Sequence, residues 1–245
     1  MIKSYFSVAL RSLLRNKLHS SINIFGLAIG MTCCILIALF VQFELGYDRQ
    51  NKNADRIYRI VIDLEANNWA ISAFPLGALL KATYPEVSGY TRFKPVEVFM
   101  QNSVSLVKNK ERVFYADSSV FDVMDIELIK GDPATALANI NSMVITEERA
   151  RTYFGDQDPV GKTLTMLGNK TEFVITGVFK PLPSNSHVHM DIMASSDNFE
   201  PMRAASPEGW NSLTNHYTYL VLPANFDYKD FEVKISKFMD KFQER

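Results

Sequence analysis

Two short patterns in this 245-residue chain contain residue types that could do chemistry. Gly161-Lys162-Thr163 has the letters that end a phosphate-binding loop, in which backbone amides and a lysine hold a nucleotide phosphate. His187 and His189 alternate along the chain with Asp191 and could present three metal ligands on one side of a strand. Each possibility depends on the neighbouring residues, which must supply the rest of the site.

A nucleotide site at Gly161 is not expected, because its surroundings are wrong for phosphate. The Walker pattern has four residues between its first glycine and the Gly-Lys pair, whereas five residues separate Gly155 from Gly161. The carboxylates of Asp156 and Asp158 would repel phosphate, and Pro159 has no amide to donate. We expect a turn that leads into a hairpin.

The histidine pair is also weaker than it looks. No further histidine is near in sequence, and Pro-Ser-Asn-Ser directly before His187 is typical of a loop, so a structural role is favoured over a metal site. The serines lack the Gly-x-Ser-x-Gly elbow of hydrolases. Cys33 and Cys34 could be a redox pair or metal ligands, but they lie inside an apolar segment and are better explained as small membrane residues. The sequence therefore predicts no catalytic residue, no metal and no cofactor.

Charge divides the chain into two parts. Residues 1–43 contain four basic residues, Lys3, Arg11, Arg15 and Lys17, and no acidic one. The remainder contains 22 basic and 27 acidic residues and is therefore mildly acidic. Nucleic acid is not an expected partner of such a body, because phosphate binding needs a basic face.

The first part ends in an apolar segment that is long enough to cross a membrane. No charged residue occurs between Lys17 and Glu44, and a helix over residues 22–43 would rise about 33 Å against a hydrocarbon core of about 30 Å. A cleaved signal peptide is the alternative, but the apolar run is too long and lacks a small-x-small cleavage site. We predict a transmembrane helix over residues 21–43 with the N-terminus in the cytoplasm, because the basic residues precede it.

One face of this helix combines small and polar residues. Asn23, Gly26, Gly30 and Cys33 recur at helical spacing, and small residues allow a second helix to approach closely. We interpret this face as a helix-packing surface. The alternative is that the glycines merely reflect their general frequency in membrane helices.

Residues 1–20 are predicted to form a basic amphipathic helix on the cytoplasmic side. Lys3, Arg11 and Arg15 lie on one face, while Ile2 and Phe6 begin an apolar stripe on another. Such a helix would lie in the interface of the lipid bilayer. The alternative is a simple basic flank that only sets the orientation of the membrane segment.

Beyond a polar connector over residues 44–54, residues 55–245 are predicted to form an α+β domain, divided into two subdomains. Asp117 is expected to cap a short helix, and Thr146 a second helix that stops at Gly155. Strands and helices mix without the regular alternation of a doubly wound sheet. The strands are expected at 56–64, 91–100, 104–107, 112–115, 127–129, 143–145, 163–167, 172–178 and 216–222, and the helices at 75–83, 118–123, 147–154 and from residue 230 onward.

The order of several motifs resembles one known family, the FtsX-like ABC transporter permeases with a MacB-like periplasmic core domain. Each motif is weak alone, but together they cover nearly the whole chain in the family's order. The motifs are Ala9–Met31, Tyr47-Asp48, Asn53–Arg59, Ala116-Asp117-Ser118, Lys130–Pro133, Val144–Glu147, Phe154-Gly155, Asp158–Lys162, Thr176-Gly177-Val178 and Pro183–His187.

The resemblance implies that this chain is the permease subunit of an ABC transporter in the bacterial inner membrane, with residues 44–245 in the periplasm. A separate ABC ATPase subunit would hydrolyse ATP, and a second permease copy would complete a dimer. The outer domain would then couple ATPase motion to efflux or to envelope processes. Lys3, Arg11, Arg15 and Lys17 would lie near the ATPase.

Permeases of this family continue with three further membrane spans, which the 245 residues do not contain, so we expect the chain to be a fragment of a longer protein. The alternative function is a membrane-anchored extracytoplasmic module that senses or binds a ligand.

Overall fold

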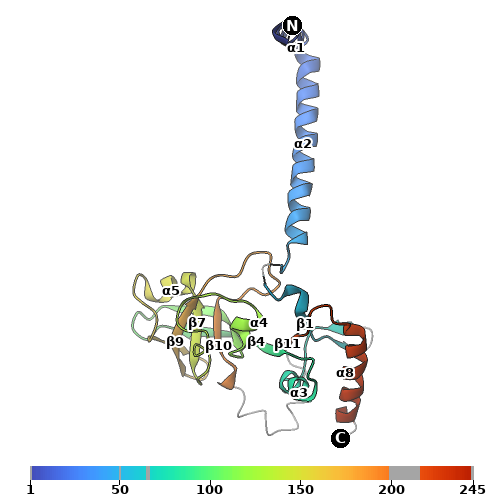
Figure 1. The fold of residues 1–245 in the computed structure, drawn as a ribbon. Helices are drawn as coiled ribbons and strands as arrows, with labels where there is room; N and C mark the ends of the chain where they lie inside the picture. Colours follow the sequence, from blue (N-terminus) through green and yellow to red (C-terminus); the bar gives the residue numbers. More distant parts are fainter. Residues whose placement is uncertain (1, 50, 65–66, 199–215, 244–245) are drawn as a thin grey trace. The chain divides into compact units, whose positions relative to one another are not determined.

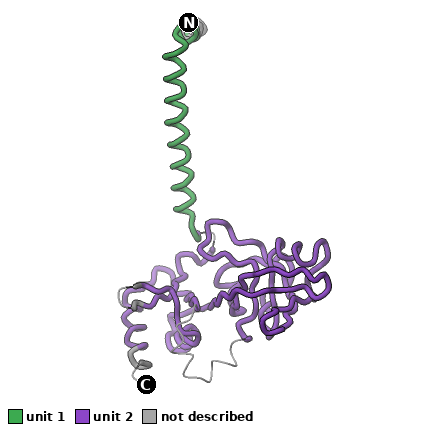
Figure 2. Tube along the Cα trace, turned by 180° about the vertical axis from the view of Figure 1, so that it is seen from behind, with its two compact units in different colours: residues 1–48 green, residues 49–245 purple. Residues whose placement is uncertain are grey.

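The computed structural model describes residues 2–49, 51–64, 67–198 and 216–243. The chain divides into two compact units, residues 1–48 and residues 49–245 (Figure 2). The boundary falls inside the predicted connector.

The first unit consists of two helices. Helix α1 spans Ile2–Arg15 and α2 spans Lys17–Leu45, with a break at Asn16. The predicted amphipathic helix over residues 1–20 therefore ends at Arg15, and α2 extends past the predicted span at both ends. By length and composition α2 is able to cross a membrane. Its mid-span Thr32 hydroxyl donates to the carbonyl of Ala28 at 2.8 Å, which satisfies this polar side chain within the helix.

The second unit is built on a mixed sheet that has nine strands in the described part of the chain (Figure 1). Its order is β1-β11-β4-β5-β10-β7-β9-β6, and β8 bridges β4 and β9. Only the β5–β10 and β7–β9 pairs are parallel among the described strands. The strands are β1 Ile57–Arg59, β4 Gly89–Gln101, β5 Lys108–Ala116, β6 Leu128–Lys130, β7 Ser142–Thr146, β8 Thr163–Met166, β9 Thr171–Phe179, β10 Ile192–Ser195 and β11 Tyr217–Val221, with a separate hairpin of β2 Ile62–Leu64 and β3 Asn67–Trp69.

The middle of the sheet is buried on both faces. Along β5, Phe114 belongs to one apolar cluster, whereas its neighbours Val113 and Tyr115 belong to another. Because successive strand residues point to opposite faces, the two clusters lie on opposite sides of the sheet. β7 divides in the same way, with Val144 in the first cluster and Met143 in the second.

Short helices cover these clusters. Helix α5 (Glu147–Phe154) covers the second cluster, and α4 (Val120–Val123) covers the first. A third cluster lies between β11, α3 (Leu76–Thr83) and α8 (Tyr228–Gln243). Two 3-10 turns, η1 (Ala54–Arg56) and η2 (Ser196–Asn198), complete the described helical elements. The α+β class and the sheet-rich domain after the apolar helix are confirmed, while the division into two subdomains stays a prediction.

One predicted strand and one predicted helix cap are wrong, each for an identifiable reason. Residues 104–107 form a loop, because Asn102 turns the chain before the apolar Val104 and Leu106. Asp117 does not cap α4, whose N-cap position is Ser119, because its carboxylate is engaged by Arg92 instead. By contrast, the Thr146 hydroxyl accepts from the amide of Arg149, and the predicted cap of α5 is confirmed.

Strand β10 was not predicted, although it lies at the centre of the sheet. Its four residues, Ile192–Ser195, are all buried. A fully buried strand has no alternation of polar and apolar residues, and this one is short, so its sequence does not distinguish it from a loop. The single strand predicted at 56–64 is divided into β1 and β2.

Two glycines bring two of the family-like motifs into contact. Gly131 follows β6 with φ +94°, and a Cβ there would lie 2.5 Å from the carbonyl oxygen of Thr176. A Cβ on Gly177 in β9 would lie 2.8 Å from the carbonyl oxygen of Lys130. Only glycine permits this approach of the two backbones, which explains both residues.

Candidate functional site

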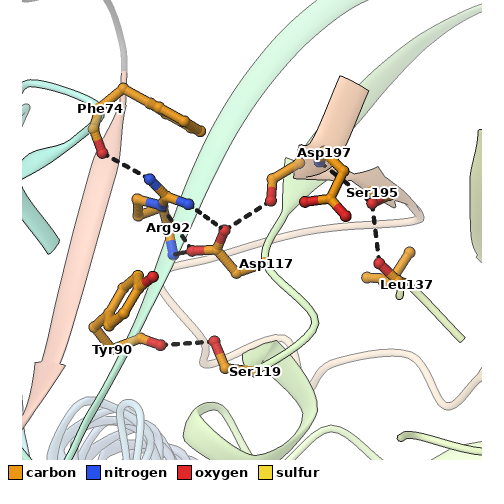
Figure 3. Close-up of polar contacts among 9 residues, drawn as sticks. Phe74, Tyr90, Arg92, Asp117, Ser119, Leu137, Ser195 and Asp197 are labelled. Atoms are coloured by element: carbon orange, nitrogen blue, oxygen red, sulfur yellow. Dashed lines mark hydrogen bonds and ion pairs between the residues drawn. The ribbon is translucent and has the colours of Figure 1, made fainter. Parts of the chain in front are cut away.

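The base of the β4–β5 hairpin holds a buried ion pair (Figure 3). The Arg92 guanidinium donates from Nε to Oδ2 of Asp117 and from Nη2 to Oδ1, each at 2.8 Å. The Arg92 amide adds a third bond to Oδ2 at 2.9 Å. The side chains are 4% and 11% exposed, so both charges are largely removed from water. The bidentate hydrogen bonds compensate for this desolvation cost.

Further contacts join this pair to three other segments. Nη1 of Arg92 donates to the carbonyl of Phe74 at 2.9 Å, and the guanidinium lies 3.9 Å from the centre of the Phe74 ring (Figure 3). The hydroxyl of Ser196 in η2 donates to Asp117 at 2.7 Å. The adjacent Ser195 donates to the carbonyl of Leu137 at 2.9 Å. The pair therefore fixes β4, the end of β5, the segment before α3 and the end of β10 to one another.

A second buried polar cluster fixes α5 to the sheet. Glu111 of β5 accepts from the Tyr153 hydroxyl at 2.9 Å, and its other oxygen lies 3.4 Å from Nε of Arg149. Arg149 also pairs with Asp191 at 3.0 Å. Burial, and then the neighbouring Glu111 carboxylate, raise the pKa of Tyr153, so its proton stays on the hydroxyl that makes this contact.

The predicted histidine pattern is divided among different partners. Nε2 of His187 lies 2.7 Å from the Tyr219 hydroxyl, and their rings are 5.5 Å apart. Asp191 is held by Arg149 instead. The His187 contact therefore ties the loop before β10 to β11, in agreement with the structural role favoured from the sequence.

The Gly161-Lys162-Thr163 segment is a turn that leads into β8, as predicted. The Gly161 amide donates to the carbonyl of Ile175 at 2.8 Å, and the Lys162 amide donates to the carbonyl of Pro159 at 3.0 Å. The first amide is thus bonded to β9 and the second lies within the turn, whereas a phosphate cradle would need both amides free.

The residues predicted to form the helix-packing face lie on the exposed surface of α2 in the first unit. Asn23, Gly26, Gly30 and Cys33 are all exposed on α2, and a Cβ added at either glycine would meet no described atom within 4 Å. Their packing role stays a prediction.

The basic residues of the same unit include Arg11 and Arg15 on α1 and Lys17 at the start of α2, and all three are exposed. Lys3 lies in α1, but its side chain is outside the described residues. Their contact with an ATPase stays a prediction.

The polar clusters were missed by sequence reasoning. Arg92 and Asp117 are 25 positions apart, and Glu111 and Tyr153 are 42 apart. Nothing local signals such pairs. One signal was available, because Arg92 is a charged residue in an otherwise β-forming run. If that strand lies in the centre of the sheet, the buried arginine requires an oppositely charged or hydrogen-bonding partner.

Comparison with known proteins identifies the domain. The family described as the MacB-like periplasmic core domain matches residues 20–236. None of the curated protein sequences compared matches the chain significantly.

Three solved structures share the fold. A domain of a putative permease protein from Porphyromonas gingivalis is 22% identical with a TM-score of 0.67, over 78% of this chain and 83% of that one. The periplasmic region of MacB from Actinobacillus actinomycetemcomitans is 12% identical with a TM-score of 0.57, over 78% and 85%. The extracellular domain of the noncanonic ABC-type transporter YknZ from Gram-positive bacteria is 16% identical with a TM-score of 0.50, over 71% and 86%.

The family match covers most of the chain and begins within α2, and the sheet domain is similar to domains of transporter and permease proteins. The chain therefore belongs to the MacB-like periplasmic core domain family of ABC transporter permease-type proteins.

Proposed function

We propose that the chain is the permease subunit of an ABC transporter, and that its outer domain couples the motion of a separate cytoplasmic ATPase to efflux or to envelope processes. The observation that carries the proposal is the family match over residues 20–236, directly after a basic segment and across an apolar helix. The absence of a nucleotide-binding motif in the sequence is compatible with hydrolysis on a partner subunit.

The charge pattern supports a bacterial inner-membrane protein with a cytoplasmic N-terminus. Arg11, Arg15 and Lys17 precede the apolar part of α2, and Glu44 and Asp48 follow it. Basic flanks are retained on the cytoplasmic side, so residues 44–245 would lie in the periplasm.

The ATPase contact is assigned to α1, because its exposed Arg11 and Arg15 would lie on the cytoplasmic side. A second permease copy would pack against the face of α2 that carries Gly26 and Gly30, because no described residue lies beside either glycine and small residues allow a helix to approach closely.

Mechanical transmission needs an outer domain that moves as a body rather than deforming. The Arg92–Asp117 pair and the Glu111–Tyr153 contact supply that stiffness, since they join segments distant in sequence inside a two-sided core.

The test is a pull-down of detergent-solubilised protein expressed in its own cell, with mass spectrometry of the recovered proteins. We expect an ABC ATPase to be recovered, and its yield to fall in the variant with Arg11→Glu and Arg15→Glu. The matched control, Arg11→Lys with Arg15→Lys, keeps the charge and should recover the ATPase normally.

Charge reversal beside a membrane helix also threatens its orientation, so the same variants require a topology measurement. Ser103→Cys, in a background with Cys33→Ser and Cys34→Ser, should react with an impermeant maleimide added outside the inner membrane. If the orientation is kept and no ATPase is recovered even with native α1, the transporter proposal is wrong, and saturable stabilisation by a small ligand would then favour the sensing module.

A further inference from the structure

The tip of the β4–β5 hairpin presents two aliphatic side chains to solvent. Val104 is 94% exposed and Leu106 is 67% exposed, whereas the adjacent Val107 packs against the core. We call Val104 and Leu106 the apolar knob. A loop of six residues could fold one of these side chains inward, so their joint exposure depends on what holds the loop.

The loop is held by the buried side chain of Asn102, which is 5% exposed. Its Oδ1 accepts from the amides of Val104 at 2.8 Å and Ser105 at 3.0 Å. Its backbone accepts from the Leu106 amide at 2.9 Å and donates to the Val107 carbonyl at 3.0 Å. These bonds fix the backbone of the knob from inside.

Two neighbouring elements brace the loop from outside. Nδ2 of Asn102 donates to the carbonyl of Tyr153 in α5 at 2.8 Å. The hydroxyl of Ser103 lies 3.1 Å from that of Thr165 in β8. The loop that carries the knob is therefore bonded to two other elements of the domain, α5 and β8.

The backbone of the knob is also strained. Leu106 has φ +57°, in the left-handed region that favours glycine. A bulky residue persists there only where its surroundings enforce the conformation, and such strain is concentrated at functional positions. A loop selected only for turning the chain would gain stability from glycine at this position.

Basic residues lie beside the knob on β5, although the domain as a whole is acidic. Lys108, Lys110 and Arg112 alternate along one exposed face of β5. Phe99 is 48% exposed on the facing strand, with Nζ of Lys108 4.8 Å from its ring centre. Two acidic residues of the described strands share this face: Glu97, which pairs with Lys110, and Glu172 of β9, which lies opposite Thr165 of β8.

We propose that the apolar knob docks into an apolar pocket bordered by carboxylates on a partner protein. Aliphatic anchors inside a charged rim are the usual construction of a protein interface, and a preformed loop loses little entropy on binding. The proposal goes beyond the permease function and does not require the ATPase.

Two other occupants are disfavoured by the same observations. A second copy meeting this chain through the same surface would bring the basic residues of both copies into one interface, where they repel. An anionic lipid bilayer would attract the basic residues. However, a fluid lipid surface has no fixed shape, so it would not require a loop held in a strained conformation.

The test is photo-crosslinking in the cell that produces the protein, with benzoylphenylalanine placed at Val104 or at Leu106 of the full chain. Val61 and Val233 are the control positions, because both are exposed elsewhere on the domain. We expect an adduct with one protein from both knob positions and none from the controls, and mass spectrometry identifies that protein.

Charge specificity then decides the proposal. Lys108→Glu with Lys110→Glu should abolish the adduct, and reversal of the rim carboxylates in the identified partner to lysine should restore it. With the two proteins purified, Val104→Ser should raise Kd about tenfold while Val233→Ser leaves it unchanged. Thermal melting of each variant verifies folding, and Val104→Ser removes no buried contact.

Several results would overturn the proposal. They are no adduct at the knob, adducts equally strong at the controls, an adduct with lipid or with a second copy of the chain, and a protein adduct that survives the charge reversal.

Discussion

The two ends of the β4–β5 hairpin invert the usual distribution of polar and apolar side chains. At its base, Arg92 and Asp117 are almost completely buried, whereas at its tip Val104 and Leu106 are largely exposed. Both ends are held by hydrogen bonds, so neither is loose. The difference is that the bonds at the base satisfy the buried groups themselves, while those at the tip fix a backbone that presents apolar groups outward. Substitutions at the base should therefore affect folding, and substitutions at the tip should affect binding.

The largest effect is expected at the base. Asp117→Ala leaves the Arg92 guanidinium buried without its carboxylate and should lower the free energy of unfolding by about 3–5 kcal/mol. Denaturant titration of the full chain in detergent measures this value. The matched control is Glu97→Ala, which removes the exposed pair with Lys110 and should cost less than about 1 kcal/mol.

A double variant sharpens the same prediction. Arg92→Met with Asp117→Leu removes both charges together, so it should be less destabilising than Asp117→Ala, because no unpaired charge stays buried. A double variant as unstable as the single one would show that the bonds to Phe74 and Ser196 matter more than the charge pair.

A smaller loss is expected from the buried side chain at the tip. Asn102→Ala removes two bonds to the loop amides and one to the Tyr153 carbonyl, and should cost about 1–3 kcal/mol. Hydrogen exchange at the amides of residues 104 and 105 should accelerate, since they lose their acceptor. Unchanged exchange there would show that Asn102 does not fix the knob.

The left-handed residue gives a prediction of opposite sign. A left-handed conformation costs an ordinary residue about 1–2 kcal/mol. Glycine avoids this cost but lowers the stability by about 0.5–1 kcal/mol, because it increases the entropy of the unfolded chain. Leu106→Gly should therefore stabilise the domain by up to about 1 kcal/mol while it weakens docking of the knob. Melting temperature and the adduct yield at Val104 measure the two effects. A destabilised variant would show that Leu106 contributes packing that outweighs its strain.

The sequence and the structure differ most where the outcome depends on distant residues. The ends of α5 were predictable because Thr146 and Gly155 act locally on the backbone. The character of α2 was predictable because composition alone decides whether a helix suits a membrane. Val104 and Leu106 are residue types that favour a strand, yet they lie in a loop. The loop is fixed by Asn102, whose side chain bonds to Tyr153, 51 positions away in the sequence.

Asp117 shows the same limit at the base of the hairpin. Its position before a short helix predicts a cap, and such a cap is a local interaction. The bidentate bond from Arg92 is a stronger competitor, but it exists only once β4 lies beside β5. The local sequence therefore predicts the short helix correctly, while tertiary contacts determine which group the Asp117 side chain binds.

The smallest predicted effect concerns an exposed ion pair, which contrasts with the buried pair at the base. Lys234 of α8 donates to Glu86 at 2.8 Å; this bond, followed by the Glu86 backbone, lowers the pKa of Glu86 from its ordinary value of 4.5. A lowered carboxyl pKa stabilises the fold above 4.5, and this contribution is lost as pH falls through the folded-state pKa. The same bond raises the pKa of Lys234, whose contribution is complete below 10.5 and is lost as pH rises further.

The attachment of α8 should therefore weaken slightly when pH falls below 4.5. Hydrogen exchange in α8, corrected for its intrinsic pH dependence, should show this loosening in the native chain and not in Glu86→Gln. The change should be much smaller than the loss in Asp117→Ala, because water screens an exposed pair and leaves a buried one unscreened. An equal loosening of α8 in Glu86→Gln would show that another group causes the acid effect. The exposed pair would then contribute no measurable stability, in contrast to the buried pair at the hairpin base.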